Sequence, residues 1–165
     1  MNILLVRGKR EQGPDVIGQA ILQNGDPLSF TVLETDDLLC SARAYHPSIF
    51  LLENSASLPF LGGLPGNPIA VFDEENHRGA AFLKDAGISA VDYGTSPRAT
   101  ISLSSLEELS ATVAVQRNLV RSDTTILEPC EVMVRRTLPM SPRQLLGAAG
   151  VLLLAGVPWE KGLRF

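Results

Sequence analysis

The feature that most constrains the fold is a regular alternation of apolar runs and helical patterns over residues 2–95. The runs, typified by "NILLV" at 2–6 and "SIFLLEN" at 48–54, are rich in aliphatic residues and have the length of strands buried on both faces of a sheet. Between the runs lie helical patterns, such as those over residues 14–25 and 76–87. Alternation of this kind predicts right-handed crossovers and an α/β fold with a doubly wound, mostly parallel sheet.

The pattern changes in the second half of the chain. Short segments of high β propensity, such as "SATVAVQRN", are separated by polar turns and predict a small antiparallel β section. The last stretch returns to a helical pattern, with Pro142 in its first turn and Gly156 as its stop. We therefore expect one unit over residues 1–165, made of a parallel α/β part (1–97), a β-rich part (98–140) and a C-terminal helix (141–165).

Composition excludes several classes of protein. The net charge of −4 argues against a basic face for nucleic acid or for an anionic membrane surface. The longest apolar run, at 145–157, is too short to span a bilayer, and the first residues lack the pattern of a signal peptide. Cys40 and Cys130 lie far apart and form no zinc motif, so we expect two small core residues in a reduced, cytoplasmic setting.

The segment after the first run has the frame of a phosphate-binding loop without its chemistry. In "GKREQGPD", Gly8 and Gly13 have the spacing of G-x-x-x-x-G-K-[ST], but Pro14 replaces the lysine and Asp15 replaces the hydroxyl residue. Pro14 has neither an amine nor a backbone N–H to offer a phosphate. A carboxylate about 4 Å from a phosphate charge would repel it by about 4 kcal/mol at an effective dielectric near 20. Both residues suit the start of a helix, so we interpret Pro14 and Asp15 as structural residues rather than as part of a working phosphate site.

The order of these elements resembles the central ATP-binding domain of the Mur ligase family. "LLVRGKREQGPDVIGQAILQNG" occupies the place of the family's phosphate loop and helix, and "TVLETDDLLCSARAYHPSIFLLEN" resembles its strand with a glutamate and its later Pro-strand-Asn. "AVFDEENHRGAAFLKDAGISAVDYGT" resembles a further strand–helix–strand segment, and "PRQLLGAAGVLLLAGVPWEKGL" matches the apolar skeleton of a late helix. The resemblance covers nearly the whole chain as scattered matches.

This resemblance implies a P-loop-type order of elements and a remnant nucleotide site, with Glu34 in the place of the magnesium-binding glutamate. The residues that it places in the remnant site are Gly8, Lys9, Arg10, Gly13, Asn54 and Asp73. An alternative for Glu34 and the two aspartates that follow it is that these acids cap the next helix. Residues 73–75, "DEE", are also typical of a solvated strand end.

The chain departs from the family pattern at several positions. Arg143, Gln144 and Gly147 stand where the family has His, Asn and Asn. The family's long helix with a modified lysine has no room between Asn54 and Ile69. No residue of this chain is therefore assigned a catalytic role.

Three functional interpretations remain at this point. The first is a non-catalytic Mur-ligase-like domain with a binding, regulatory or scaffold role linked to cell-wall precursor metabolism, which needs no cofactor. The second is a subunit or fragment of an ATP-dependent carboxylate–amine ligase, for which ATP and Mg²⁺ would be cofactors and Arg7 would join the phosphate contacts. The third is a flavodoxin- or receiver-like module. In each case we expect a protein partner or a homodimer, and no binding to nucleic acid or membranes.

Overall fold

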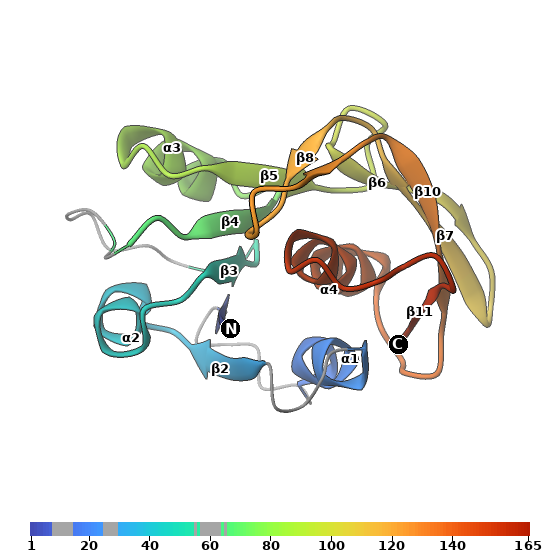
Figure 1. The fold of residues 1–165 in the computed structure, drawn as a ribbon, viewed down its shortest axis with the longest axis horizontal. Coiled ribbons are helices and arrows are strands. Elements are labelled where there is room, and N and C mark those ends of the chain that lie inside the picture. Colours follow the sequence, from blue (N-terminus) through green and yellow to red (C-terminus); the bar gives the residue numbers. More distant parts are fainter. Residues whose placement is uncertain (8–14, 25–29, 55, 57–63, 65) are drawn as a thin grey trace.

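The computed structural model describes residues 1–7, 15–24, 30–54, 56, 64 and 66–165. Figure 1 shows the elements in chain order from blue to red. They are β1 (Asn2–Val6), α1 (Val16–Asn24), β2 (Thr31–Thr35), α2 (Leu38–Tyr45), β3 (Ile49–Leu52), β4 (Ile69–Asp73), α3 (His77–Asp85), β5 (Ala90–Tyr93), β6 (Ile101–Leu106), β7 (Ser110–Val115), β8 (Leu119–Val120), β9 (Ile126–Leu127), β10 (Cys130–Arg135), α4 (Pro142–Leu154) and β11 (Leu163–Arg164).

Nine strands form one sheet in the order β11-β10-β7-β6-β5-β4-β3-β1-β2. The five strands from β2 to β5 are all parallel. Within them the order is β2-β1-β3-β4-β5, so the chain reverses its direction of winding between β1 and β3. Ligands of doubly wound sheets bind outside the carboxyl ends of the strands at such a switch point. The predicted fold class is confirmed.

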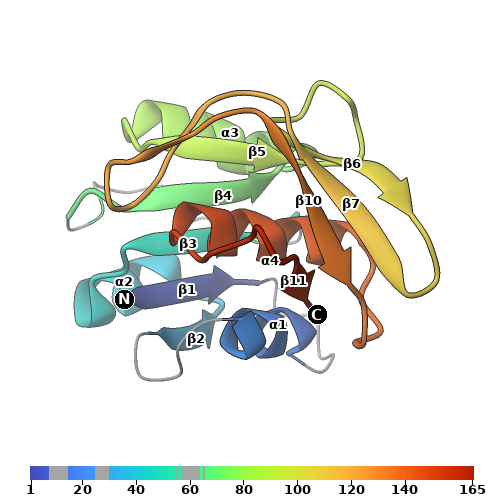
Figure 2. The ribbon, with the colours of Figure 1, turned by 45° about the vertical axis from the view of Figure 1, so that its right-hand side comes forward.

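The β-rich section continues the parallel sheet. β6 joins β5 in parallel through the pair Tyr93 and Ile101, and β6, β7 and β10 then pair antiparallel. β11 closes the far edge in parallel with β10, while β8 and β9 pair as a separate hairpin. Figure 2 shows β6, β7 and β10 turning away from the plane of β1–β5. The sheet therefore curls, and its concave side holds a helix.

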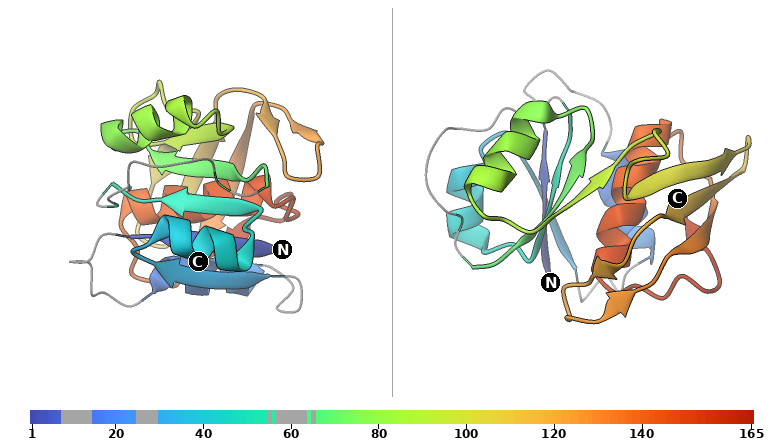
Figure 3. Two further views of the ribbon diagram at one scale, coloured as in Figure 1. Left: turned by 90° about the vertical axis from the view of Figure 1, so that its left-hand side faces the viewer. Right: turned by 90° about the horizontal axis from the view of Figure 1, so that it is seen from above.

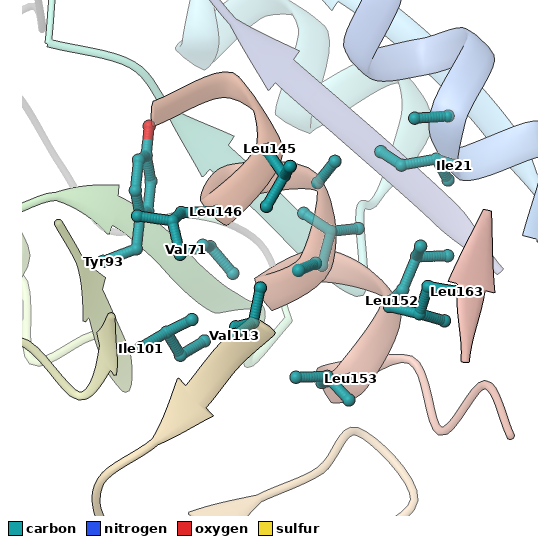
Figure 4. Packing of buried hydrophobic residues seen from close by; sticks show 14 of the residues in the cluster. Ile21, Val71, Tyr93, Ile101, Val113, Leu145, Leu146, Leu152, Leu153 and Leu163 are labelled. Atoms are coloured by element: carbon teal, nitrogen blue, oxygen red, sulfur yellow. The ribbon is translucent and has the colours of Figure 1, made fainter. Parts of the chain in front are cut away.

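That helix is α4, which lies inside the curve of the sheet. Viewed from above, α2 and α3 cover one face of the parallel strands, while α1 and α4 lie on the other (Figure 3). Every residue of α4 from Leu145 to Leu154 is buried. Its side chains pack in one cluster with residues from α1 and from strands along the sheet, among them Val71, Tyr93 and Ile101 (Figure 4). Because strands flank it on more than one side, α4 can be apolar around its whole circumference.

Two glycines let α4 approach the strands closely. A Cβ on Gly147 would lie 3.2 Å from a methyl group of Leu51, and one on Gly150 would lie 3.0 Å from a methyl group of Val71. These contacts are tighter than most that a real Cβ makes. The repeated glycines of "LLGAAG" are thus explained by helix–sheet packing.

The helix ends agree with the sequence patterns. Ser141 caps α4 in a capping box with Gln144, and Asn76 caps α3. Asp37 caps α2 by accepting from the Cys40 N–H, as the capping interpretation of the acids after Glu34 predicts. Gly156, expected as a stop, has a positive φ angle of 77°, and Gly87, shortly after α3, has one of 65°.

The expectation of two core cysteines is wrong for Cys40. Cys40 is exposed, whereas Cys130 is half-buried and packs against the core. Cys40 belongs to α2, and Cys130 is the first residue of β10. Within the described ranges, no helix has the length and apolar character needed to cross a membrane.

Candidate functional site

A buried arginine occupies the switch point of the sheet. Arg7 directly follows β1, and only 8% of its surface is exposed. Its Nε lies 3.0 Å from Oε1 of Glu53, and its Nη1 lies 2.9 Å from Oε1 of Glu34. Its Nη2 lies 3.6 Å from Oδ1 of Asp15. One guanidinium thus contacts carboxylates that come from β2, from the end of β3 and from the start of α1. We call these four residues the Arg7 cluster.

Strand register brings the Arg7 cluster together. Val6, the last residue of β1, pairs with Thr35 on one side and with Leu52 on the other. The N–H of Arg7 donates to the Thr35 carbonyl at 3.0 Å, and the N–H of Glu53 donates to the Val6 carbonyl at 3.2 Å. The backbone therefore holds Arg7 between the two neighbouring strands at their carboxyl ends.

The charges in the Arg7 cluster shift one another's pKa values. Burial alone would lower the pKa of Arg7, but the carboxylates of Glu53, Glu34 and Asp15 outweigh it and raise that pKa above its usual value. Burial raises the pKa of Glu34, and so do a hydrogen bond with the Asp15 side chain and the negative charge of Asp15. Arg7 opposes this rise. Arg7 therefore stays charged, whereas Glu34 takes up a proton more readily than an isolated glutamate.

Asp15 also starts α1. Its Oδ1 accepts a hydrogen bond of 2.6 Å from the N–H of Gly18. A Cβ on Gly18 would lie 1.9 Å from Oδ2 of Asp15, so glycine leaves the space that this carboxylate fills. The structural interpretation of Asp15, a carboxylate that favours the start of a helix, agrees with this contact.

A second arginine lies at the carboxyl end of β4. Arg143, in the first turn of α4, donates from Nη1 to Oδ1 of Asp73 and from Nη2 to Oε1 of Glu75. The Asp73 side chain is 2% exposed, and its Oδ1 also accepts from the Glu75 N–H at 2.9 Å. The expectation of a solvated strand end is therefore wrong for Asp73, because Arg143 covers it. It holds for Glu75, whose side chain is 57% exposed.

Asn76 connects the two arginines. Its side-chain N–H donates to the Glu53 carbonyl at 2.8 Å, and its backbone N–H donates to the Asp73 carbonyl at 2.8 Å. Only 4% of Asn76 is exposed. A continuous path of polar contacts therefore runs along the carboxyl edge of the sheet from Arg7 through Glu53, Asn76 and Asp73 to Arg143.

The structure places the sequence-predicted site residues as follows. Glu34 belongs to the Arg7 cluster, and Asp73 pairs with Arg143. Asn54 follows Glu53 and is exposed. The remaining residues of the expected remnant site lie outside the described residues: Gly8, Lys9, Arg10 and Gly13. In the described part of the chain, no group of three or more His, Cys, Asp or Glu side chains is arranged to hold a metal ion.

Sequence reasoning missed Glu53 and the pairing of Arg143. Glu53 carried a signal, because it is a charged residue at the end of the apolar run "IFLL". Arg143 was noted only as a departure from the family's histidine. Its pairing with Asp73 joins residues 70 positions apart and had no local signal.

Comparisons with known proteins give a likeness of fold. No protein-family model matches the chain, and neither does any curated protein. A solved structure of UDP-N-acetylmuramoylalanyl-D-glutamyl-2,6-diaminopimelate–D-alanyl-D-alanyl ligase from Acinetobacter baumannii matches with a TM-score of 0.58 and 12% identity. A structure of MurF from the same organism matches with a TM-score of 0.59 and 13% identity. Each match covers 98% of this chain and 45% of the ligase chain. This chain therefore has a Mur-ligase-like fold and spans less than half the length of the ligases that it matches.

Proposed function

We propose that this chain is a Mur-ligase-like domain that has lost ATP chemistry and serves as a binding, regulatory or scaffold module in a process linked to cell-wall precursors. One observation carries the proposal: the Glu34 carboxylate, expected as a magnesium ligand, lies 2.9 Å from the guanidinium of Arg7. The chain itself supplies the positive charge at the switch point of the sheet.

The described residues do not fit a magnesium ion at this place. A dication about 4 Å from the Arg7 guanidinium would be repelled by about 8 kcal/mol at an effective dielectric of about 20. Arg7 could not easily move away, since its backbone N–H is held by Thr35 and its Nε by Glu53. Asp15 adds a negative charge at the start of α1, where a phosphate would otherwise meet free N–H groups.

Calorimetric titration of the whole chain with ATP and excess Mg²⁺ tests the proposal. We expect no saturable heat up to about 1 mM nucleotide, which corresponds to binding weaker than about −4 kcal/mol. A phosphate-loop ATPase titrated in the same buffer serves as the positive control. A dissociation constant in the micromolar range would contradict the proposal.

The second candidate function is a subunit or fragment of an ATP-dependent amide ligase. The observation that favours it is the likeness of fold to the two ligase structures named above, of whose length this chain covers 45%. In this case a partner would supply the missing phosphate contacts. A co-purifying protein that restores ATP turnover would support it, and unchanged turnover in Glu34→Ala would count against it.

A further inference from the structure

The contact between Arg143 and β4 has the features of a binding site for one kind of cation. Two nitrogens of the same guanidinium reach two different carboxylates, Asp73 and Glu75. Both carboxylates belong to the short segment that ends β4, and the Glu75 N–H fixes Oδ1 of Asp73 at 2.9 Å. A planar group with donors pointing apart matches such a pair better than a spherical charge does.

We propose that Asp73 and Glu75 form a receptor for a guanidinium group, which Arg143 fills from within the chain and through which α4 is tethered to the end of β4. The ligand class is a small planar cation with at least two N–H donors. This inference is independent of whether the Arg7 cluster excludes ATP and Mg²⁺.

The fixed positions of the two carboxylates give the receptor its selectivity. The Asp73 side chain is 2% exposed while Arg143 covers it, and removal of the Arg143 side chain takes one charged donor from Asp73 and one from Glu75 and opens both carboxylates to a cation from solution. The neighbouring Asn76 cannot turn to Asp73 without losing its bonds to the Glu53 carbonyl and to the Gly79 N–H. Asp73 would keep the bond from the Glu75 N–H, and the pair of carboxylates would favour uptake of a cation that reproduces both lost donors. The bonds to Asp73 also raise the pKa of Arg143, so this guanidinium remains charged.

The capping box fixes the approach of Arg143. Ser141 and Gln144 exchange hydrogen bonds at the first turn of α4, and Pro142 lies at its start. Arg143 therefore projects from a turn whose backbone is set by its neighbours. Because α4 is buried from Leu145 to Leu154, a contact at Arg143 holds the start of the core helix as well as a side chain.

Chemical rescue of Arg143→Ala tests the receptor. We expect about 20 mM guanidinium chloride, far below denaturing concentrations, to raise the Tm of this variant by about 3 °C if the site binds with a dissociation constant of about 5 mM. Equal concentrations of NaCl and of ammonium chloride should give no comparable rise. The wild-type chain, whose receptor is filled, and Arg135→Ala, which removes an exposed arginine of β10, are the matched controls.

Two results would overturn the proposal. The first is that guanidinium does not raise the Tm of Arg143→Ala. The second is that ammonium raises this Tm equally, or that guanidinium raises the Tm of Arg135→Ala equally, since either result would reveal an effect that does not depend on the receptor. If Arg143→Ala fails to fold, NMR of the wild-type arginine side chains decides instead. Slow rotation of the Arg143 guanidinium, with free rotation at Arg135, would support the receptor, and free rotation at both would overturn it. No nucleotide enters either test, so their failure would leave the proposed function standing.

Discussion

The two arginines at the carboxyl edge differ in depth and in the number of elements that they join. The Arg7 side chain is 9% exposed and contacts carboxylates from three separate elements. The Arg143 side chain is 30% exposed and contacts two carboxylates from a single turn. A buried ion that loses its partner costs far more than an exposed one. Arg7 therefore acts as a central support of the sheet, whereas Arg143 acts as a tether for one helix.

Removal of Arg7 should have the largest effect. We expect Arg7→Ala to lower the free energy of unfolding by about 3 kcal/mol, because it leaves Glu53 buried beside two further carboxylates. Urea denaturation measures this loss. The exposed Arg135→Ala should change the free energy of unfolding by less than about 0.5 kcal/mol. A similar, small effect of both variants would remove the central role of Arg7.

The loss of stability on replacing each carboxylate around Arg7 should increase with the burial of that carboxylate. The Glu53 side chain is 11% exposed and that of Glu34 is 42% exposed. We expect Glu53→Gln to cost about 2 kcal/mol and Glu34→Gln less than about 1 kcal/mol, since solvent screens the exposed pair. The same denaturation experiment compares them. The reverse ranking would show that burial does not set the strength of this cluster.

Removal of Arg143 should have an intermediate effect. We expect Arg143→Ala to cost about 1.5 kcal/mol, which lies between the ranges for exposed and for buried ion pairs. Arg143→Lys should recover only part of this loss, because an ammonium group cannot span both carboxylates. If Arg143→Ala proved as costly as Arg7→Ala, the distinction between support and tether would fail.

The smallest effect should be a dependence of stability on pH at Glu34. Burial and the neighbouring Asp15 raise its pKa above the usual value of 4.5. Between that value and the raised one, the folded chain binds more protons than the unfolded chain, so the free energy of unfolding falls as pH rises. Denaturation at a series of pH values should show this fall in the wild type and a weaker one in Glu34→Gln. If the free energy of unfolding fell equally with pH in both proteins, a group other than Glu34 would be responsible.

Local patterns were sufficient to predict the elements but insufficient to predict how the second half of the sheet is joined. The helix expected over residues 76–87 is α3, at His77–Asp85, because its cap and its stop are local signals. The β-rich section was expected as a small antiparallel section after the parallel part. Its attachment to the same sheet depends on the pair Tyr93 and Ile101, and propensity identifies a strand without identifying its neighbour.

The site was predictable only where polar residues stand at strand ends. The resemblance implied a metal role for Glu34 and a place in the remnant nucleotide site for Asp73, and both residues lie towards the carboxyl ends of parallel strands. Their partners were not predicted, because Arg7 meets Glu53 across 46 positions and Arg143 meets Asp73 across 70. Such contacts depend on register and on the path of α4, which no local pattern encodes. The assignment of Glu34 to a metal stays a prediction.

The structure of crystals grown with ATP and Mn²⁺ would test most directly whether the Arg7 guanidinium takes the place of a metal ion at the carboxyl edge of the sheet. Anomalous scattering locates Mn²⁺ independently of any assumption about the protein. We expect the guanidinium of Arg7 to remain within hydrogen-bond distance of Glu34 and Glu53, with no anomalous peak beside either carboxylate. A peak at bonding distance from Glu34, with Arg7 turned away, would contradict the proposed loss of ATP chemistry.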